Sequence, residues 1–176
     1  MKQYIVDAFT DRAFHGNPAA ICVMDQWPDE QLMMDIAMEN NLSETAFIVK
    51  EEVMGKELDL ICVLQDTNQV KDFVPNAELI KKLPGRMLHI TAPGIGQYDC
   101  CSRCFGPKIG ILEDPVCGSA HCQIIPYWAK RLGKSTIDAW EASLRGGALQ
   151  GEILNNEQLI IRGNATLFAE SDLRIS

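Results

Sequence analysis

The chain has 176 residues, of which 47% are hydrophobic and 23% are charged, and this ordinary globular composition excludes wholesale disorder and low-complexity assemblies. A chain of this length can build one good core or two small ones. Its net charge of -8 repels phosphate backbones and anionic lipids, so we expect no nucleic acid and no membrane among its partners.

The first fifty residues predict the order strand, loop, strand, helix, strand. Strands at residues 4–9 and 19–24 flank a turn at residues 15–18. Pro28 begins a helix that ends at the turn-forming pair Asn40 and Asn41. Apolar residues at helical spacing predict one buried stripe on this helix. The stripe consists of Leu32, Met33, Ile36 and Ala37. A third strand is predicted at residues 44–49.

The charged segment at residues 51–56 is the one linker candidate, and it divides the chain into a first unit, residues 1–52, and a second, residues 53–176. The second unit predicts an α+β arrangement in which mixed sheets fold around a few helices. Its predicted strands are 58–64, 87–91, 98–105, 137–142, 148–154, 158–162 and 165–169, and its predicted helices are 77–83 and about 118–132, the latter ending before Gly133.

The seven cysteines are more typical of reduced thiols than of a disulfide framework. Cys22 and Cys62 lie in apolar runs, where we expect them to pack in the core. The strand at 98–105 places Cys101 and Cys104 on opposite faces, so we expect no metal site there. The chain has no apolar stretch long enough to span a bilayer and no signal-like N-terminus, so we expect a cytoplasmic protein.

Glu44 opens a strand in otherwise apolar surroundings. Partial burial would raise its pKa toward neutrality, as a general acid or base requires. The alternative is a solvated glutamate at a strand end. Asn17 stands in the tight turn before the second strand, which by itself predicts only a hairpin loop.

A second candidate site is the start of the helix at residue 118, where Gly118, Ser119 and Ala120 follow Asp114. The free N–H groups of a first helical turn and the helix dipole bind anions, and glycine lets a ligand approach closely. Helix capping alone is the alternative explanation for Asp114 or Ser119.

Cys117, next to this turn, is either a thiolate of low pKa at a helix N-terminus or an inert buried thiol. His121 lies one turn inside the helix. A histidine there is more often a satisfied core residue than a proton shuttle.

Three motifs together resemble the PhzF-like phenazine-biosynthesis family. They are His-Gly-Asn-Pro-Ala-Ala at 15–20, Asn-Leu-Ser-Glu-Thr-Ala-Phe at 41–47, and the long run at 102–121 that contains Glu-Asp-Pro-Val-Cys-Gly-Ser-Ala-His. The resemblance implies the fold of diaminopimelate epimerase, with two pseudo-symmetric halves that each wrap a mixed sheet round a central helix. It also implies an isomerase that moves a proton at carbon, in the cleft between the halves, without metal or organic cofactor.

By the same resemblance, Glu44 matches the catalytic glutamate. Asp114 and Ser119 match the aspartate and serine that hold the substrate, a small carboxylated molecule, and Asn17 faces the cleft. Cys117 falls where related epimerases carry a catalytic cysteine. We therefore predict Glu44, Asp114 and Cys117 as catalytic residues, and Asn17, Gly118, Ser119 and Ala120 as substrate-binding residues.

The resemblance covers residues 1–50 and about 54–176, and the rest of the first half, including the family's Gly-His motif, is absent from this sequence. Two hypotheses follow. Either the chain is an isomerase that rebuilds the missing wall of its cleft from a second copy, as a homodimer, or it is an inactive, internally deleted family member that keeps the motifs as scaffold.

Overall fold

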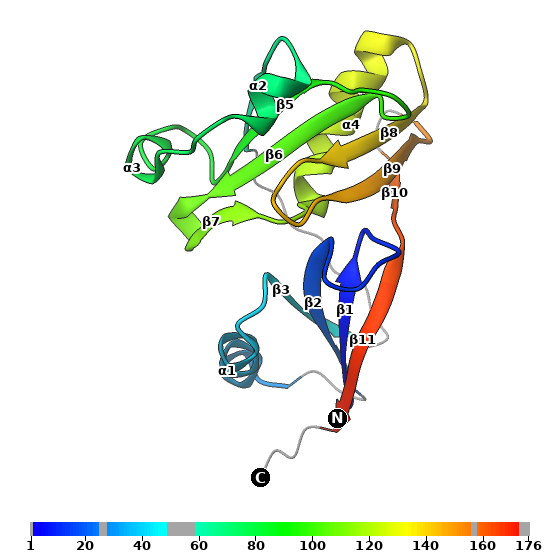
Figure 1. Cartoon of the computed structure of the whole chain (residues 1–176). Helices are drawn as coiled ribbons and strands as arrows, with labels where there is room; N and C mark the ends of the chain where they lie inside the picture. Colours follow the sequence, from blue (N-terminus) through cyan, green and yellow to red (C-terminus); the bar gives the residue numbers. More distant parts are fainter. Residues whose placement is uncertain (1, 25–27, 49–58, 156–157, 173–176) are drawn as a thin grey trace.

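The computed structural model describes residues 2–24, 28–48, 59–155 and 158–172, whose strands form two sheets (Figure 1). The first sheet has four strands in the order β11-β1-β2-β3. They are β1 (Lys2–Ala8), β2 (Asn17–Val23), β3 (Glu44–Ile48) and β11 (Ala165–Asp172). β1 pairs antiparallel with both β11 and β2, whereas β2 and β3 are parallel. The last strand of the chain therefore returns to the sheet that the first strand begins.

The second sheet has seven strands, in the order β10-β9-β8-β6-β5-β4, with β7 also paired to β6. Its members are β4 (Leu60–Val63), β5 (Leu88–Pro93), β6 (Cys100–Gly106), β7 (Ile111–Asp114), β8 (Thr136–Glu141), β9 (Gly147–Ile153) and β10 (Leu159–Arg162). A short 3-10 helix at Pro107–Ile109 joins β6 to β7. The α+β architecture with mixed sheets is thus confirmed.

Helix α4 (Gly118–Leu132) packs against the seven-stranded sheet and forms the main core with it (Figure 1). Ile124, Ile125 and Trp128 are almost completely buried in this core. The helix ends where the sequence predicts, because Gly133 takes the left-handed conformation that closes it, with φ +67°. Pro126 lies inside the helix without dividing it.

Helix α1 (Glu30–Asn40) is capped by Asp29, whose side chain accepts the Leu32 N–H at 2.8 Å. The predicted apolar stripe occupies the side of α1 that is partly covered, but no residue of this helix is buried. The prediction that α1 has a buried stripe was therefore wrong. In the described part of the chain, α4 packs against a sheet of seven strands, whereas α1 lies beside β3 at the side of a sheet of four strands (Figure 1). The smaller sheet leaves α1 only partly covered.

The predictions for the two cysteines in apolar runs had different outcomes. Cys22 is completely buried, as expected, but Cys62 is exposed because β4 is the edge strand of its sheet. A run of apolar letters does not distinguish an edge strand from a central one. Cys101 and Cys104 belong to hydrophobic clusters on opposite faces of β6, which confirms the predicted alternation.

Two short helices cover the face of the sheet opposite α4. α3 (Ala77–Ile80) is shorter than predicted, and α2 (Thr67–Lys71) was not predicted. Val70 and Ile80 from these helices pack against Leu88, Ile90 and Phe105 of the sheet. No helix in the described part of the chain is long and apolar enough to cross a membrane.

Backbone and side-chain hydrogen bonds join the two sheets near the β8–β9 turn. The Gly16 N–H donates to the Gly146 carbonyl at 2.8 Å, and the Ala148 N–H donates to the Phe9 carbonyl at 3.0 Å. Arg145, in the same turn, donates to the buried Asp7 carboxylate at 2.6 Å. These contacts hold the start of β2, and therefore Asn17, against the seven-stranded half.

Candidate active site

Asn17 links two motifs that are distant in the sequence. It begins β2, is 3% exposed, and donates through Nδ2 to the Val116 carbonyl at 3.0 Å, with Asp114 Oδ1 at 3.5 Å. Its Oδ1 has no hydrogen-bond partner among the described residues. The turn at residues 15–18 is thus more than a hairpin loop, because it contacts the segment that leads into α4.

Glu44 is the first residue of β3 and pairs in register with Ala19 of β2. The residue keeps a solvent-exposed surface, yet surrounding protein removes enough water to raise the pKa of its carboxyl group. The negative charge of Asp114 raises this pKa further, and the positive charge of Arg86 opposes the rise. Glu44 and Asp114, from different sheets, therefore lie within electrostatic reach of each other.

Asp114 ends β7 and is 3% exposed. Burial raises the pKa of its carboxyl group, and hydrogen bonds from the Cys117 thiol and the Val116 N–H oppose this rise. The Val116 bond to Oδ1 measures 3.1 Å. The carboxylate closes the turn that precedes α4, but it does not cap the helix, since the N-cap residue is Cys117.

Cys117 has features of both of its predicted readings. Cys117 is only 4% exposed. A hydrogen bond with the Cys104 thiol lowers the pKa of the Cys117 thiol, and this effect outweighs burial, which raises it. Sγ lies 3.4 Å from Ser119 Oγ, and the Ala120 N–H also donates to it. Cys117 is therefore a thiol of lowered pKa with little direct access from solvent.

The first turn of α4 is only partly open to a ligand. Ser119 is exposed, Gly118 is half-buried and Ala120 is buried. Among the described residues, no hydrogen bond occupies the N–H groups of Gly118 and Ser119. A Cβ added to Gly118 would lie 3.3 Å from Phe9 Cζ, so glycine here also lets an aromatic ring from the turn after β1 approach the helix.

Arg86 is a site residue that the motifs did not reveal. It stands just before β5, donates to Asp59 at 3.2 Å, and lies near enough to Glu44 to lower the pKa of that residue. The signal in the sequence was only a cation after the Pro84–Gly85 turn, which is typical of any exposed loop. Arg86 therefore places a positive charge near Glu44, and the same charge is paired with the buried Asp59 carboxylate.

The family model described as phenazine biosynthesis-like protein (PhzC-PhzF) matches residues 6–60 and 53–171. The chain belongs to this PhzF-like family. The two matches meet at the segment where the sequence places the missing block of the first half.

Relatives and solved structures agree with the family. An uncharacterized isomerase of Pseudomonas aeruginosa is 30% identical over 256 positions, covering 97% of each chain, and one of Halalkalibacterium halodurans is 28% identical over 258 positions with the same coverage. The structure of a PhzF-family protein from Enterococcus faecalis superposes with a TM-score of 0.86 at 32% identity, and the match covers 99% of each chain. The structure of a putative PhzC/PhzF protein from Clostridium difficile superposes with a TM-score of 0.85 at 30% identity, and the match covers 99% of this chain and 100% of the other. Because these sequence alignments are longer than 176 residues, the relatives contain a block that this PhzF-like chain lacks.

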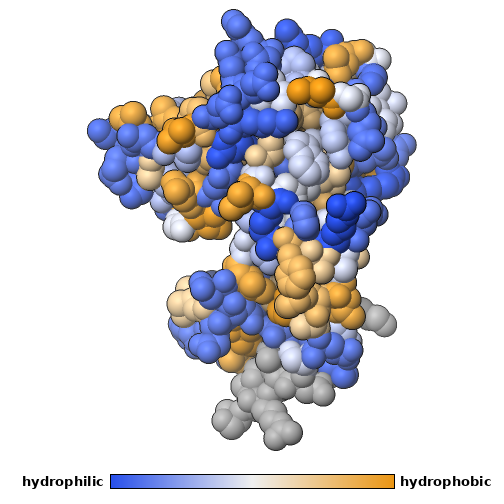
Figure 2. Space-filling view, viewed as in Figure 1, coloured by the Kyte–Doolittle hydropathy of each residue, from blue (hydrophilic) through white to orange (hydrophobic). Residues whose placement is uncertain are grey.

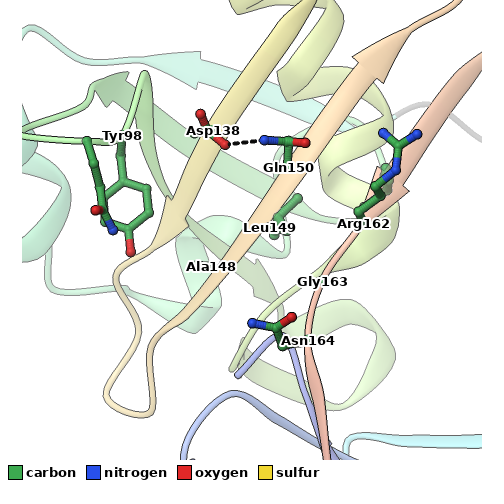
Figure 3. Close-up of a pocket in the computed structure, with 10 residues that line it drawn as sticks. Tyr98, Asp138, Ala148, Leu149, Gln150, Arg162, Gly163 and Asn164 are labelled. Carbon is green, nitrogen blue, oxygen red and sulfur yellow. Dashed lines mark hydrogen bonds between the residues drawn. The ribbon is translucent and has the colours of Figure 1, made fainter. Parts of the chain in front are cut away.

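One cavity of the PhzF-like chain lies away from the candidate site. It has a volume of about 830 Å³ and is lined by polar residues of β8, β9 and β10, among them Asp138, Gln150 and Arg162 (Figure 3). None of the predicted site residues lines it. In the described part of the chain, His, Cys, Asp and Glu side chains do not gather in any group of three or more suited to a metal ion.

His121 is a core histidine, as the more common reading predicted. It has no exposed surface, Nε2 lies 3.1 Å from Ser102 Oγ, and Nδ1 lies 2.7 Å from the Cys117 carbonyl. Burial lowers its pKa from 6.5 to about 4. The ring is therefore neutral at physiological pH and does not act as a proton shuttle at the surface.

The lowered pKa of His121 predicts a specific dependence of stability on pH. Between pH 4 and 6.5 the unfolded chain binds a proton at this residue and the folded chain does not. The free energy of unfolding should therefore fall as the pH drops below 6.5, by about 1.4 kcal/mol per pH unit from this residue. Denaturant unfolding at several pH values, in the wild type and in His121→Gln, measures it. Parallel curves for the two proteins between pH 4 and 6.5 would contradict the prediction.

Proposed function

We propose that the chain is a cofactor-independent isomerase or epimerase that moves a proton at a carbon atom of a small carboxylated molecule. The observation that carries the proposal is the contact between the two sheets: Asn17 of β2 donates to Val116 and Asp114, and Glu44 begins β3, the strand beside β2. This junction brings Glu44 within electrostatic reach of Asp114. A carboxyl group with a raised pKa and an open surface is suited to exchange a proton at neutral pH. The names of relatives as uncharacterized isomerases support the same class of reaction.

Each residue has a role in this proposal. Glu44 takes the proton from carbon, and the exposed Ser119 hydroxyl with the N–H groups of Gly118 and Ser119 holds the substrate carboxylate. Asn17 and Asp114 lie beside the same turn, where the unpaired Asn17 Oδ1 accepts a hydrogen bond from the substrate. Cys117, with its lowered pKa, serves as the second acid or base.

The test is the exchange of carbon-bound hydrogen for solvent deuterium, followed by NMR in a panel of small carboxylic acids incubated with the protein. Exchange in at least one compound is expected. The PhzF-family protein from Enterococcus faecalis serves as the full-length control. If that protein catalyses exchange in a compound and this chain catalyses it in none, the proposed activity is wrong.

The alternative is that the chain is an inactive family member that binds a small anion at most. The observation in its favour is helix α1, none of whose residues is buried, together with the block present in relatives and absent here. A proton-transfer site tolerates displacements of only about 0.5 Å, so loss of one wall would abolish turnover if nothing replaced it.

A homodimer is the expected means of replacing that wall. Phe14, Leu167 and Phe168 are 70%, 58% and 54% exposed, and the rings of Phe14 and Phe168 are in contact at 5.5 Å. Figure 2 shows hydrophobic residues gathered over the four-stranded half of the molecule. β11, which carries Leu167 and Phe168, is also the edge of its sheet. This surface fits a second copy of the chain, which would dock at the edge opposite to β3 and would have to extend past the sheet to reach the cleft.

Light scattering at micromolar concentration should therefore give twice the mass of one chain, and Phe168→Glu should convert the dimer to a monomer. Val74→Glu is the matched control, since Val74 is an apolar residue, 85% exposed, outside this surface. A wild-type chain that stays monomeric would exclude this route to a complete cleft.

A further inference from the structure

Glu141 stands where the strand pattern predicts an apolar residue. Along β8, Ile137 and Ala139 point into the core around α4, and Glu141 takes the next inward position with no exposed surface. A buried carboxyl group costs several kcal/mol unless other groups compensate it. Its contacts should therefore explain why it is there.

The contacts of Glu141 lead to the N-cap of α4. Oε2 accepts the Cys117 N–H at 3.0 Å, and Cys117 is the N-cap residue of the helix. The Cys117 carbonyl accepts from His121 Nδ1 at 2.7 Å. Because a carbonyl only accepts, Nδ1 carries the proton of the neutral ring, and Nε2 accepts from the Ser102 hydroxyl. Buried side chains thus hold Cys117 at both its N–H and its carbonyl.

The Cys117 backbone is central to the candidate site. Just before it, the Val116 N–H donates to Asp114 and the Val116 carbonyl accepts from Asn17. Just after it, the Cys117 thiol contacts the Ser119 hydroxyl. A shift of the Cys117 N–H would move each of these contacts.

We propose that Glu141 is a positioning residue for the candidate active site, holding the Cys117 N–H so that Asp114, Asn17 and Ser119 keep their relative positions. The inference rests on the proposed function only for its consequence in catalysis, since the contacts are testable without a substrate.

Burial, and after it the neighbouring Cys117, raise the pKa of Glu141 well above its ordinary value. Its other oxygen, Oε1, has no hydrogen-bond partner among the described residues. Glutamine has the same shape and keeps one acceptor oxygen for the Cys117 N–H. We therefore expect Glu141→Gln to preserve the position of Cys117, and Glu141→Leu, of similar volume but without an acceptor, to release it.

The experiment is NMR of the whole chain in three forms: wild type, Glu141→Gln and Glu141→Leu. Hydrogen exchange of the Cys117 amide reports the bond itself, and the Asn17 side-chain NH2 resonances report its effect across the junction. Glu141→Leu should accelerate exchange of the Cys117 amide about tenfold or more and shift the Asn17 resonances, and Glu141→Gln should leave both near their wild-type values.

Asp138→Leu is the matched control, because Asp138 is a carboxylate of the same strand on its outer face, bonded to Gln150 at 2.7 Å (Figure 3). It should leave both signals unchanged. Unmoved Asn17 resonances in Glu141→Leu, or a Glu141→Gln protein that behaves like Glu141→Leu, would overturn the proposal. If Glu141→Leu does not fold, the wild type decides: a Cys117 amide that exchanges as fast as that of Ser119 would overturn it.

Discussion

Replacement of Glu44 by glutamine should reduce the rate of solvent deuterium incorporation into a substrate between about a hundredfold and ten-thousandfold, the usual contribution of a general acid or base. Glutamine has nearly the same shape but cannot exchange a proton with carbon. Since Glu44 has an exposed surface, the thermal midpoint should change by less than about 4 °C. NMR of the substrate in D2O and a thermal melt measure the two effects.

Glu39→Gln provides the control for the change of charge. Glu39 is an exposed glutamate of α1 and has no part in the proposed reaction. Its replacement should leave exchange unchanged. Undiminished exchange in Glu44→Gln would mean that Glu44 is structural and that another group moves the proton.

Replacement of Arg145 by alanine should lower the free energy of unfolding by about 3 kcal/mol. Arg145 donates to Asp7 at 2.6 Å, to the Gly16 carbonyl at 2.7 Å and to the His15 carbonyl at 3.0 Å. Without it, the buried Asp7 carboxylate retains the Phe14 N–H, at 2.7 Å, as its partner. The change removes a main connection between the two sheets, and urea unfolding measures its cost.

The control is Arg162→Ala, which removes an ion pair with Glu152 whose side chains are 50% and 38% exposed. Such a surface pair contributes less than about 1 kcal/mol. Adding Asp7→Asn to Arg145→Ala should recover part of the loss, because the buried charge is then gone. Equal losses in Arg145→Ala and Arg162→Ala would show that the connection adds nothing beyond an ordinary surface contact.

Periodicity predicted most of the fold because its main elements obey simple rules. The alternation of β8 and the bounds of α4, from Gly118 to the residue before Gly133, follow directly from the sequence. α2 was missed because a five-residue helix with one apolar side chain, Val70, has too little periodicity to detect. The exposure of Cys62 and the partial burial of α1 depend on which elements lie beside them, and a local pattern does not contain that information.

The motifs predicted most residues of the candidate site but not the contacts between them. They indicated Asn17, Glu44 and Asp114, but no spacing along the chain gives the distance from Asn17 to Val116 or the charge of Arg86 near Glu44. Glu141 did leave a signal, since it is an acid at an inward position of a predicted strand. The catalytic and binding roles of all these residues stay predictions until a substrate is found.

The central claim is that Glu44 and Asp114 face the same site, and the pKa of Glu44 tests it most directly. Carbon-13 NMR of the side-chain carboxyl group should give a pKa above the ordinary glutamate value in the wild type and a lower one in Asp114→Asn, because the amide removes a negative charge from its surroundings. A Glu44 pKa that is the same in both proteins would show that the two carboxyl groups do not share a site.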